Sequence, residues 1–408
     1  MIDFLTLSDL ALQGKTVLLR ADLNVPMQNG RVSDTERLER LLPTLKDLSK
    51  AGAKIAILSH FGRPKNGPDP ACSLYPVVEA LENLWQQKIA FAEDCVGPKA
   101  EAAIKALAPG QIVVLENTRF HAGEEANDPA FIKELAKLGD IYVNDAFSCA
   151  HRSHASTEGL AHYLPSAAGR LMQAELVALD KALTDPEHPL VAVVGGSKIA
   201  TKLDLLNNLV PKVDVLILGG GMANTFLASR GVEIGKSLCE NDMLATAREI
   251  SAQADIHHCT ILLPQDAVVA EVLKSGIETE IVPINSIPTN KMVLDIGPAS
   301  IKDIRAKLAE CKTVVWNGPL GAFEFKPFDN GTNEVAAAVA DLTRQGKILS
   351  VAGGGDTVAA MANAGVSRYL SYLSTAGGAF LEWLEGKDLP GVAALRQSAT
   401  QKKRVASR

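Results

Sequence analysis

Short apolar runs alternate with longer amphipathic stretches along almost the whole chain, and this alternation limits the folds that the chain can adopt. Most runs are apolar at every position, as expected for strands that helices cover on both faces. We therefore predict an α/β fold with parallel sheets, built from βαβ units. The predicted strands are residues 16–20, 54–59, 111–116, 141–144, 190–194, 213–218, 260–263, 292–296, 313–316 and 348–352.

The stretches between the runs carry apolar residues at three- and four-residue spacings, and several begin near an Asp, Ser or Thr that can cap a helix. We predict crossover helices there. The clearest are residues 34–51, 74–87, 129–138 and 332–345. A chain of 408 residues is long enough for two or three domains. A helical pattern at 169–183, followed by a polar stretch with two prolines at 184–189, predicts the boundary between two of them.

Composition excludes several classes of protein. Hydrophobic residues make up 47% of the chain and charged residues 22%, as in globular proteins and unlike disordered or fibrous chains. The net charge of −6 predicts no general attraction to nucleic acid or to an anionic membrane. No apolar run reaches the roughly 18 residues needed to span a bilayer, and the N-terminus lacks the pattern of a signal peptide. We predict a cytoplasmic protein.

The cysteines do not form a recognisable pattern. None of the six belongs to a C-x-x-C pair, so neither a zinc knuckle nor a disulfide framework is predicted and we expect free thiols. They are Cys72, Cys95, Cys149, Cys239, Cys259 and Cys311.

Ligands bind at the carboxyl ends of the strands in open parallel sheets, so the residues after each predicted strand are the candidates for chemistry. In the first half of the chain four strand ends deliver guanidinium or imidazole groups. Several arginines converging from different strands predict a pocket for a small, multiply charged anion. The four sequences are RADLNVP from Arg20, HFGRP from His60, ENTRFH from Glu116 and NDAFSCAHRSH from Asn144.

In the second half the predicted strands end in glycine-rich loops, which let backbone N–H groups approach a phosphate. Together with Lys198, Lys202, Asp356 and Thr357, these loops predict a site for nucleotide phosphates and Mg²⁺. The loops are GGSK from Gly195, GGG from Gly219, PQD from Pro264, GP from Gly297, NGP from Asn317, GGGDT from Gly353 and STAGG from Ser374.

Common catalytic motifs do not occur. The chain has no Walker A sequence, and residues 219–224 lack the last glycine of a dinucleotide fingerprint, which argues against a P-loop enzyme or a standard dehydrogenase. There is also no G-x-S-x-G and no H-E-x-x-H motif. An anion pocket in one domain and a nucleotide pocket in the other suit a bisubstrate phosphotransferase that closes around its ligands. A phosphohistidine relay stays open, although direct in-line transfer is simpler.

The ordered motifs resemble the phosphoglycerate kinase family from about residue 3 to residue 395. They are RADLNVP, SHFGRP, LENTRFHAGEE, VNDAFSCAHRSHAS, VVGGSKIATK, LGGGMANTF, DIGPAS, VVWNGPLGAFEF, AGGGDT and STAGGAFLEWLEGKDLPGVAAL. The resemblance implies two doubly wound, Rossmann-like domains joined by a hinge helix. It also implies reversible phosphoryl transfer between 1,3-bisphosphoglycerate and ADP, giving 3-phosphoglycerate and ATP with Mg²⁺, in a monomer without nucleic-acid or membrane partners.

The same resemblance assigns residues to sites. It implies that Arg37 and Lys198 are the catalytic cations, approaching the transferred group from opposite domains, and that His151 and His154 lie beside the substrate. The implied substrate-binding residues are Asp22, Asn24, Arg37, His60, Phe61, Gly62, Arg63, Arg119 and Arg152. The implied nucleotide-binding residues are Gly196, Lys202, Gly219, Gly220, Asn317, Pro319, Glu324, Gly354, Gly355, Asp356 and Thr357, with Asp356 also on the metal.

We expect residues 1–168 to form a phosphoglycerate-binding domain, 169–189 the interdomain helix and linker, and 190–373 a nucleotide-binding domain. Residues 374–396 should return toward the first domain, and 397–408 should be a disordered basic tail. Four positions depart from the family pattern, namely Ser148, Cys149, Arg170 and Ala376. The alternatives are an NAD-dependent dehydrogenase, which the missing fingerprint opposes, and a non-catalytic nucleotide or metabolite sensor on the same scaffold.

Overall fold

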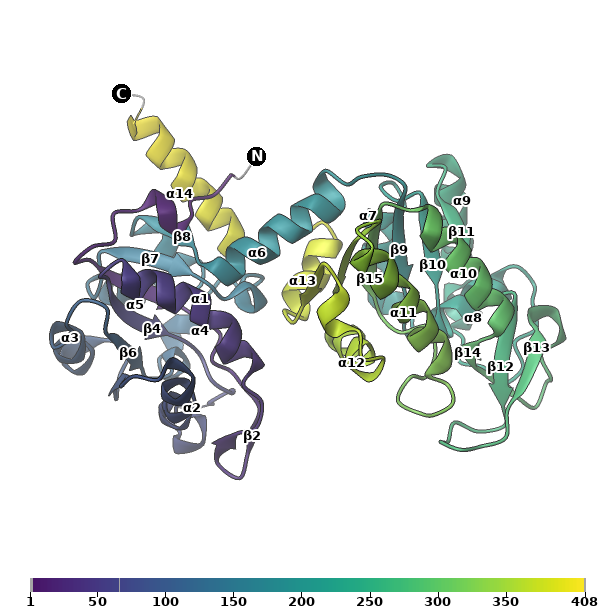
Figure 1. Ribbon diagram of the computed structural model, residues 1–408, viewed down its shortest axis with the longest axis horizontal. Coiled ribbons are helices and arrows are strands. Elements are labelled where there is room, and N and C mark those ends of the chain that lie inside the picture. Colours follow the sequence, from purple (N-terminus) through teal and green to yellow (C-terminus); the bar gives the residue numbers. More distant parts are fainter. Residues whose placement is uncertain (1–2, 66, 407–408) are drawn as a thin grey trace. The chain divides into compact units, whose positions relative to one another are not determined.

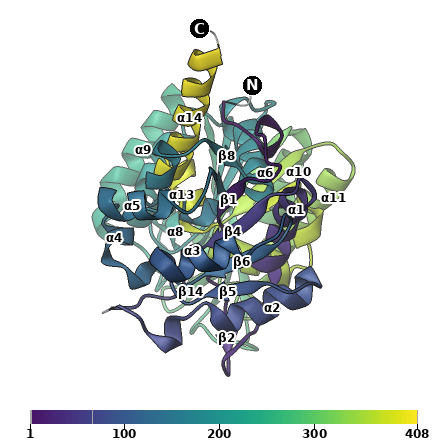
Figure 2. The same cartoon turned by 90° about the vertical axis from the view of Figure 1, so that its left-hand side faces the viewer.

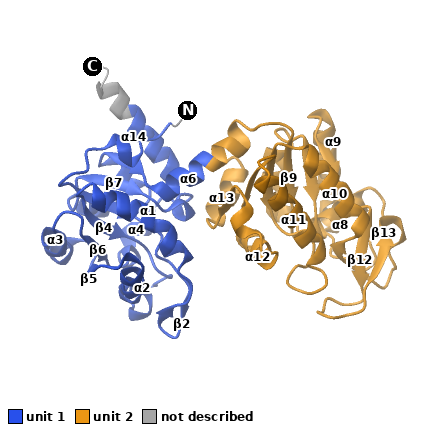
Figure 3. Cartoon of the chain, viewed as in Figure 1, with its two compact units in different colours: residues 1–177, 388–408 blue, residues 178–387 orange. Residues whose placement is uncertain are grey.

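The computed structural model describes residues 3–65 and 67–406 (Figure 1). The chain divides into two compact units (Figure 3). Unit 1 consists of residues 1–177 and 388–408, and unit 2 of residues 178–387, so the chain passes between the units twice. Among the described helices, none combines the length and the apolarity that crossing a bilayer requires.

The sheet of unit 1 is parallel, with the strand order β5–β6–β4–β1–β7–β8 over the described chain. A small antiparallel hairpin, β2–β3, follows β1. The strands are β1 (Thr16–Arg20), β2 (Met27–Gln28), β3 (Arg31–Val32), β4 (Lys54–Leu58), β5 (Ala90–Ala92), β6 (Ile112–Leu115), β7 (Ile141–Asn144) and β8 (Ser166–Ala168). The helices are α1 (Glu36–Lys50), α2 (Tyr75–Trp85), α3 (Gly97–Lys105), α4 (Ala122–Glu125), α5 (Pro129–Ala136), α6 (Arg170–Leu179) and α14 (Pro390–Ala406).

Helices cover both faces of this sheet, which explains why its central strands are apolar at every position. Helices α1 and α2 pack on one face, and α3, α5 and α14 contribute to the core on the other. Figure 2 shows α1 and α5 on opposite sides of β1 and β4. Helix α1 buries leucines at three- and four-residue spacing, and its acidic N-terminus and Lys50 at its C-terminus complement the helix dipole.

Unit 2 has a second parallel sheet, ordered β11–β10–β9–β15–β16–β17 over the described chain. Its strands are β9 (Leu190–Val194), β10 (Val215–Leu218), β11 (Thr260–Leu262), β15 (Thr313–Asn317), β16 (Leu349–Gly353) and β17 (Tyr372–Ser374). The helices are α7 (Leu203–Leu209), α8 (Gly220–Ser229), α9 (Leu244–Ile256), α10 (Pro298–Glu310), α11 (Asn330–Arg344), α12 (Gly355–Asn363) and α13 (Gly378–Leu384). The prediction of an α/β fold with two parallel sheets is confirmed.

One predicted strand lies in a different kind of sheet. Residues 292–296 form β14 (Met292–Ile296), which pairs antiparallel with β12 (Asp266–Ala270), and β12 also pairs antiparallel with β13 (Glu280–Pro283). The expectation that β14 belongs to a parallel sheet is therefore wrong. Its first three residues are only partly buried, because they line a pocket, so their apolar character reflects a ligand cavity and not a doubly covered strand.

The C-terminal segment also differs from its predicted course. Residues 374–387 stay in unit 2, where α13 packs on α7, and the chain belongs to unit 1 only from Asp388. Helix α14 packs on β8 and on the turn Gly159–His162. It is described as a helix to Ala406, and residues 407–408 lie outside the described chain. Leu395 and Ala399 are buried on its apolar face, and the disordered tail at 397–408 stays a prediction.

We expect Leu395→Ala to lower the free energy of unfolding by about 2–5 kcal/mol, because this fully buried side chain on α14 would leave a cavity. Gln397→Ala, at an exposed position of the same helix, is the matched control and should change it by less than about 0.5 kcal/mol. Chemical unfolding measures both. Equal, small effects would show that α14 does not contribute to the core of unit 1.

Candidate functional site

The four charged loops of unit 1 follow four neighbouring strands. Because β6, β4, β1 and β7 are adjacent and parallel, their carboxyl ends lie along one edge of the sheet. The loops after them carry the residues that the sequence singled out. Hydrogen bonds join the loops to one another: Leu23 N–H donates to Ser59 Oγ (2.9 Å), and Arg119 Nη1 donates to the carbonyl of Gly62 (2.8 Å).

Asp22 and Asn24 hold the predicted catalytic arginine. Arg37 Nη1, on α1, donates to Asp22 Oδ2 and to the carbonyl of Asn24, both at 2.8 Å. Ser148 Oγ donates to the same Asp22 oxygen at 2.5 Å, and Gly62 N–H donates to Asn24 Oδ1 at 3.0 Å. Asp22 is therefore a positioning group for Arg37. The contact of Ser148 was not predicted, since a residue 126 positions away gives no sequence signal.

Two histidines of this cluster, His60 and His154, are neutral at pH 7. His60 is only 5% exposed, and its Nδ1 accepts from Arg20 Nη2 at 3.0 Å. Burial, with Arg20 beside it, lowers the pKa of His60 far below its usual value. Burial and the nearby Arg119 lower the pKa of His154 to about 4. The positive charge at this edge therefore comes from guanidinium groups, and the imidazoles act as hydrogen-bonding groups.

The arginines differ in exposure. Arg119 is largely buried and its Nε is 2.9 Å from Glu125 Oε1, whereas Arg152 and His151 are half-buried. Arg63 is exposed on the loop after β4. Phe61, which precedes Gly62, is buried. Arg20 was not assigned to the substrate site; it is 1% exposed, and its Nε donates to Ser156 Oγ at 2.9 Å.

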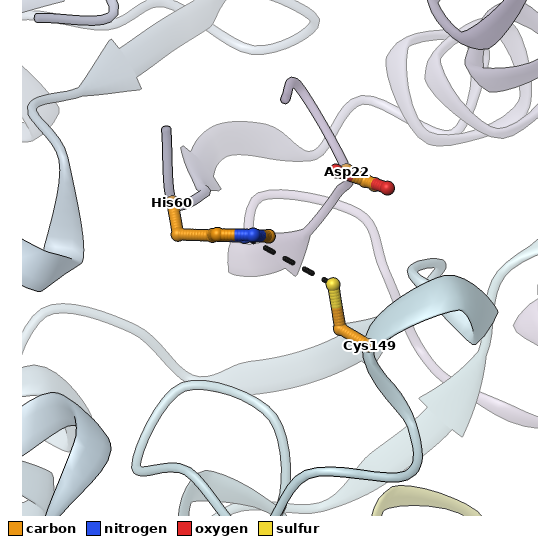
Figure 4. Close-up of side chains that lie close together, drawn as sticks. All are labelled: Asp22, His60 and Cys149. Carbon is orange, nitrogen blue, oxygen red and sulfur yellow. Dashed lines mark hydrogen bonds between the residues drawn. The ribbon is translucent and has the colours of Figure 1, made fainter. Parts of the chain in front are cut away.

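Cys149 lies next to this network, as Figure 4 shows. Its Sγ is 3.9 Å from His60 Nδ1, and one ligand atom each of Asp22, His60 and Cys149 lie within 4.8 Å of one another. Burial raises the pKa of the Cys149 thiol, so it stays protonated at neutral pH and is a poor nucleophile. Arg20 already occupies His60 Nδ1, and we assign no metal to this group.

Unit 2 contains a pocket of about 390 Å³ with a mostly apolar lining. Of the predicted nucleotide-binding residues, Gly196, Gly220, Pro319, Glu324 and Asp356 line it. The sequence analysis missed its apolar wall, since such residues in strands and helices are indistinguishable from core residues. That wall includes Ala223, Leu227, Leu238, Met292, Val293, Leu294 and Leu320. An apolar slot of this size with polar groups at one end is typical of small-molecule sites.

Lys202 connects the ends of the central strands beside this pocket. Its Nζ donates to the carbonyl of Gly195 (2.7 Å), to Asn317 Oδ1 (2.6 Å) and to the Asn317 carbonyl (3.1 Å). Asn317 Nδ2 in turn donates to the carbonyl of Gly353 at 2.9 Å. Burial lowers the pKa of Lys202 to about 8, so the side chain is still mostly protonated at pH 7.

The phosphate-type loop after β16 has the required backbone conformation. Gly354 has a φ of +99°, which favours glycine, and α12 begins directly after it. Thr357 Oγ1 accepts from Gly318 N–H at 2.7 Å and fixes this loop to the end of β15. Gly220, the first residue of α8, has a φ of +67°, and a Cβ there would lie 2.6 Å from the Gly196 carbonyl. The N-terminus of α12, which includes Gly355, is suited to an anion.

Lys198 is exposed on the loop after β9 and does not belong to the described lining of the pocket. Its loop is held by a residue that the sequence analysis missed: the Ile199 and Ala200 N–H groups donate to the carboxylate of Glu240. Gly219 is the N-cap residue of α8 at the end of β10 and does not belong to the described lining of the pocket.

Asp356 fits the expected role toward Mg²⁺. Its side chain is exposed in the first turn of α12 and lines the pocket. Mg²⁺ is commonly held by one or two carboxylates together with substrate phosphates and waters, so a single carboxylate beside an anion-binding helix end is a suitable donor set.

Two parallel α/β units, one with clustered guanidinium groups and the other with a glycine-lined apolar pocket, define a kinase of a small anionic substrate. The family model of phosphoglycerate kinase matches residues 7–387. The phosphoglycerate kinase of Rhodospirillum centenum is 64% identical over 392 residues, covering 96% of this chain and 99% of that protein. That of Ruegeria sp. is 59% identical over 96% of this chain and 99% of that protein.

Solved structures of phosphoglycerate kinases also match this chain. The structure of phosphoglycerate kinase from Coxiella burnetii matches with a TM-score of 0.91 at 44% identity, covering 97% of this chain and all of that one. The enzyme from Pyrococcus horikoshii matches with a TM-score of 0.81 at 32% identity, covering 98% of this chain and all of that one. The chain belongs to the phosphoglycerate kinase family. It is thus a phosphotransferase of glycolysis that binds ATP, and the dehydrogenase alternative is wrong.

We expect the partly buried His154 to lower the free energy of unfolding as the pH falls below 6.5. The folded pKa of about 4 lies below the ordinary 6.5, so the unfolded chain takes up this proton first and stability is lost as the pH falls from 6.5 toward 4. His154→Gln should make the decline shallower, whereas His257→Gln, at an exposed position, should not. Chemical unfolding across this pH range measures the slopes; an unchanged slope for His154→Gln would contradict the buried neutral imidazole.

We expect Lys202→Met to weaken ATP binding about 10- to 100-fold, because charged hydrogen bonds contribute about 1.5–3 kcal/mol each. The substitution also leaves Asn317 Oδ1 without its donor. Lys212→Met is the matched control, since Lys212 is exposed and donates to Asn208. Calorimetric titration with ATP measures both, and equal affinities would exclude Lys202 from the nucleotide site.

Proposed function

We propose that this chain catalyses reversible, Mg²⁺-dependent transfer of a phosphoryl group between 1,3-bisphosphoglycerate and ADP, giving 3-phosphoglycerate and ATP. The observation that carries this proposal is the convergence of guanidinium and imidazole groups on one sheet edge of unit 1. A substrate with a carboxylate and a phosphate needs several such groups around it, and bidentate arginine contacts suit both.

Unit 1 is the proposed phosphoglycerate-binding domain. Arg119 and Arg152 supply charge, and the neutral His60 and His154 add hydrogen bonds without adding like-charge repulsion among the arginines. Arg37 extends from α1, and its ion pair with Asp22 fixes the orientation of the guanidinium group. The other proposed contacts are Asn24, Phe61, Gly62 and Arg63.

Unit 2 is the proposed nucleotide-binding domain. The apolar wall of its pocket suits a purine ring, and Glu324, which lines the pocket, would accept a hydrogen bond from a sugar hydroxyl. Lys202 and the N-terminus of α12, at Gly354 and Gly355, would hold the phosphates. Mg²⁺ on Asp356 and the nucleotide phosphates would neutralise charge on the phosphoryl oxygens.

The transfer itself requires no general base in the proposed mechanism. The acceptor is a carboxylate, which is already ionised at pH 7 because its pKa lies several units lower. Catalysis then depends on positioning and on neutralising the charge of the moving group, which we assign to Arg37 and Lys198. Direct in-line transfer requires the ligands to meet, and we propose that the chain crossings near α6 and Asp388 act as the hinge for closure.

We expect Arg37→Ala and Lys198→Ala to lower kcat about 10²- to 10³-fold with smaller changes in either KM, as for other lost transition-state cations. Arg40→Ala is the matched control for Arg37, since it lies on the same helix and pairs with Glu36. A coupled assay with 3-phosphoglycerate, ATP and Mg²⁺ gives the constants. Changes confined to KM would overturn the transition-state role.

The same assay tests the activity as a whole. A folded sample that forms no ADP in the presence of Mg²⁺ would favour the alternative of a non-catalytic sensor. The cytoplasmic location, the monomeric state and the absence of nucleic-acid and membrane partners stay predictions.

A further inference from the structure

Unit 1 contains a second Asp–Cys–His group, apart from the residues assigned to the substrate. Asp94 and Cys95 lie between β5 and α3, and His121 lies between the turn Thr118–Phe120 and α4. One ligand atom of each residue lies within 4.8 Å of the other two. His121 Nε2 and Asp94 Oδ1 are 2.7 Å apart. A stacked contact with Phe131, with ring centroids 5.1 Å apart, holds the imidazole in this orientation.

These three side chains are ligands of the type that zinc-class cations prefer. A thiolate, an imidazole nitrogen and a carboxylate oxygen bind Zn²⁺ at about 2.0–2.3 Å, so closing this group around an ion needs side-chain shifts of about 1 Å. Asp94 and His121 also line a cavity of about 540 Å³, which would leave a fourth coordination position open to water.

The surrounding charge distinguishes this group from the similar one at Asp22, His60 and Cys149. Burial, and after it the negative charges of Asp94, Glu124 and Glu116, raise the pKa of the Cys95 thiol well above its usual value. The second cavity also has Asp69 and Glu93 in its lining.

Around His60 the charged neighbours are instead cationic, with Arg20, Arg119 and Arg152 foremost. A divalent cation is attracted to the first environment and repelled by the second.

We propose that Asp94, Cys95 and His121 form a binding site for a divalent cation of the zinc class. The bound ion ties the segment after β5 to the segment that also carries Arg119, two residues before His121. Each ligand binds without a proton on the coordinating atom. Binding therefore releases the Cys95 thiol proton to solvent. His121 coordinates through Nε2, so the proton that this nitrogen donates to Asp94 Oδ1 moves through solvent to Nδ1.

Titration of the full-length, reduced, chelator-treated protein with Co²⁺ tests this site, because a thiolate ligand gives a sulfur-to-cobalt charge-transfer band in the near ultraviolet. We expect one equivalent to produce the band and Zn²⁺ to displace the Co²⁺. Cys95→Ala should abolish the band, and His121→Asn should weaken metal binding by on the order of 10-fold or more. Zn²⁺ should raise the melting temperature of the unaltered protein but not of Cys95→Ala.

Cys149→Ser is the matched control, since Cys149 is also buried in a group with an Asp and a His. It should keep the band. His121→Asn keeps the proposal testable if Cys95→Ala does not fold, because His121 is partly exposed. The proposal is overturned if the unaltered protein gives no thiolate band, if the affinity is unchanged in a folded His121→Asn variant, or if Cys149→Ser removes the band.

Discussion

The parallel strands of each sheet must all end at the same edge, and both proposed sites depend on this constraint. In unit 1 it brings the loops after four adjacent strands together, and with them several guanidinium groups that repel one another. The fold offsets that repulsion locally. Asp22 pairs with Arg37, Glu125 pairs with Arg119, and the buried Arg20 reaches Ser156 and the nitrogen of His60. The result is a cluster of guanidinium groups with two neutral imidazoles, which is suited to a small anion.

In unit 2 the same constraint acts through backbone groups and one lysine. The Lys202 ammonium lies where β9 and β15 end. Within the described part of the chain it donates three hydrogen bonds, all to backbone or amide oxygens. A buried cation satisfied only by neutral oxygens retains its attraction for a phosphate. Gly354 and Gly220 then let the chain turn close to that point.

Most of this architecture could be predicted because the central strands are apolar throughout and are followed by loops rich in glycine or in charged residues. Three-residue strands such as β5, β8 and β17 were not predicted, since so few residues give no periodicity. Strand β14 was assigned to the wrong sheet because a pocket wall and a strand core look alike in sequence. Contacts between segments far apart in the sequence, such as Glu240 with the loop of Lys198 or α14 with β8, are set by the tertiary fold and leave no local signal.

Hydrogen exchange with each substrate added separately tests most directly whether each unit carries its own anion site. With 3-phosphoglycerate alone, we predict slower amide exchange in the loops after β1, β4, β6 and β7. With ATP and Mg²⁺ alone, protection should appear in the loops after β9, β15 and β16 and in the first turn of α12. Protection of the same unit by both ligands, or of neither set of loops, would contradict the account.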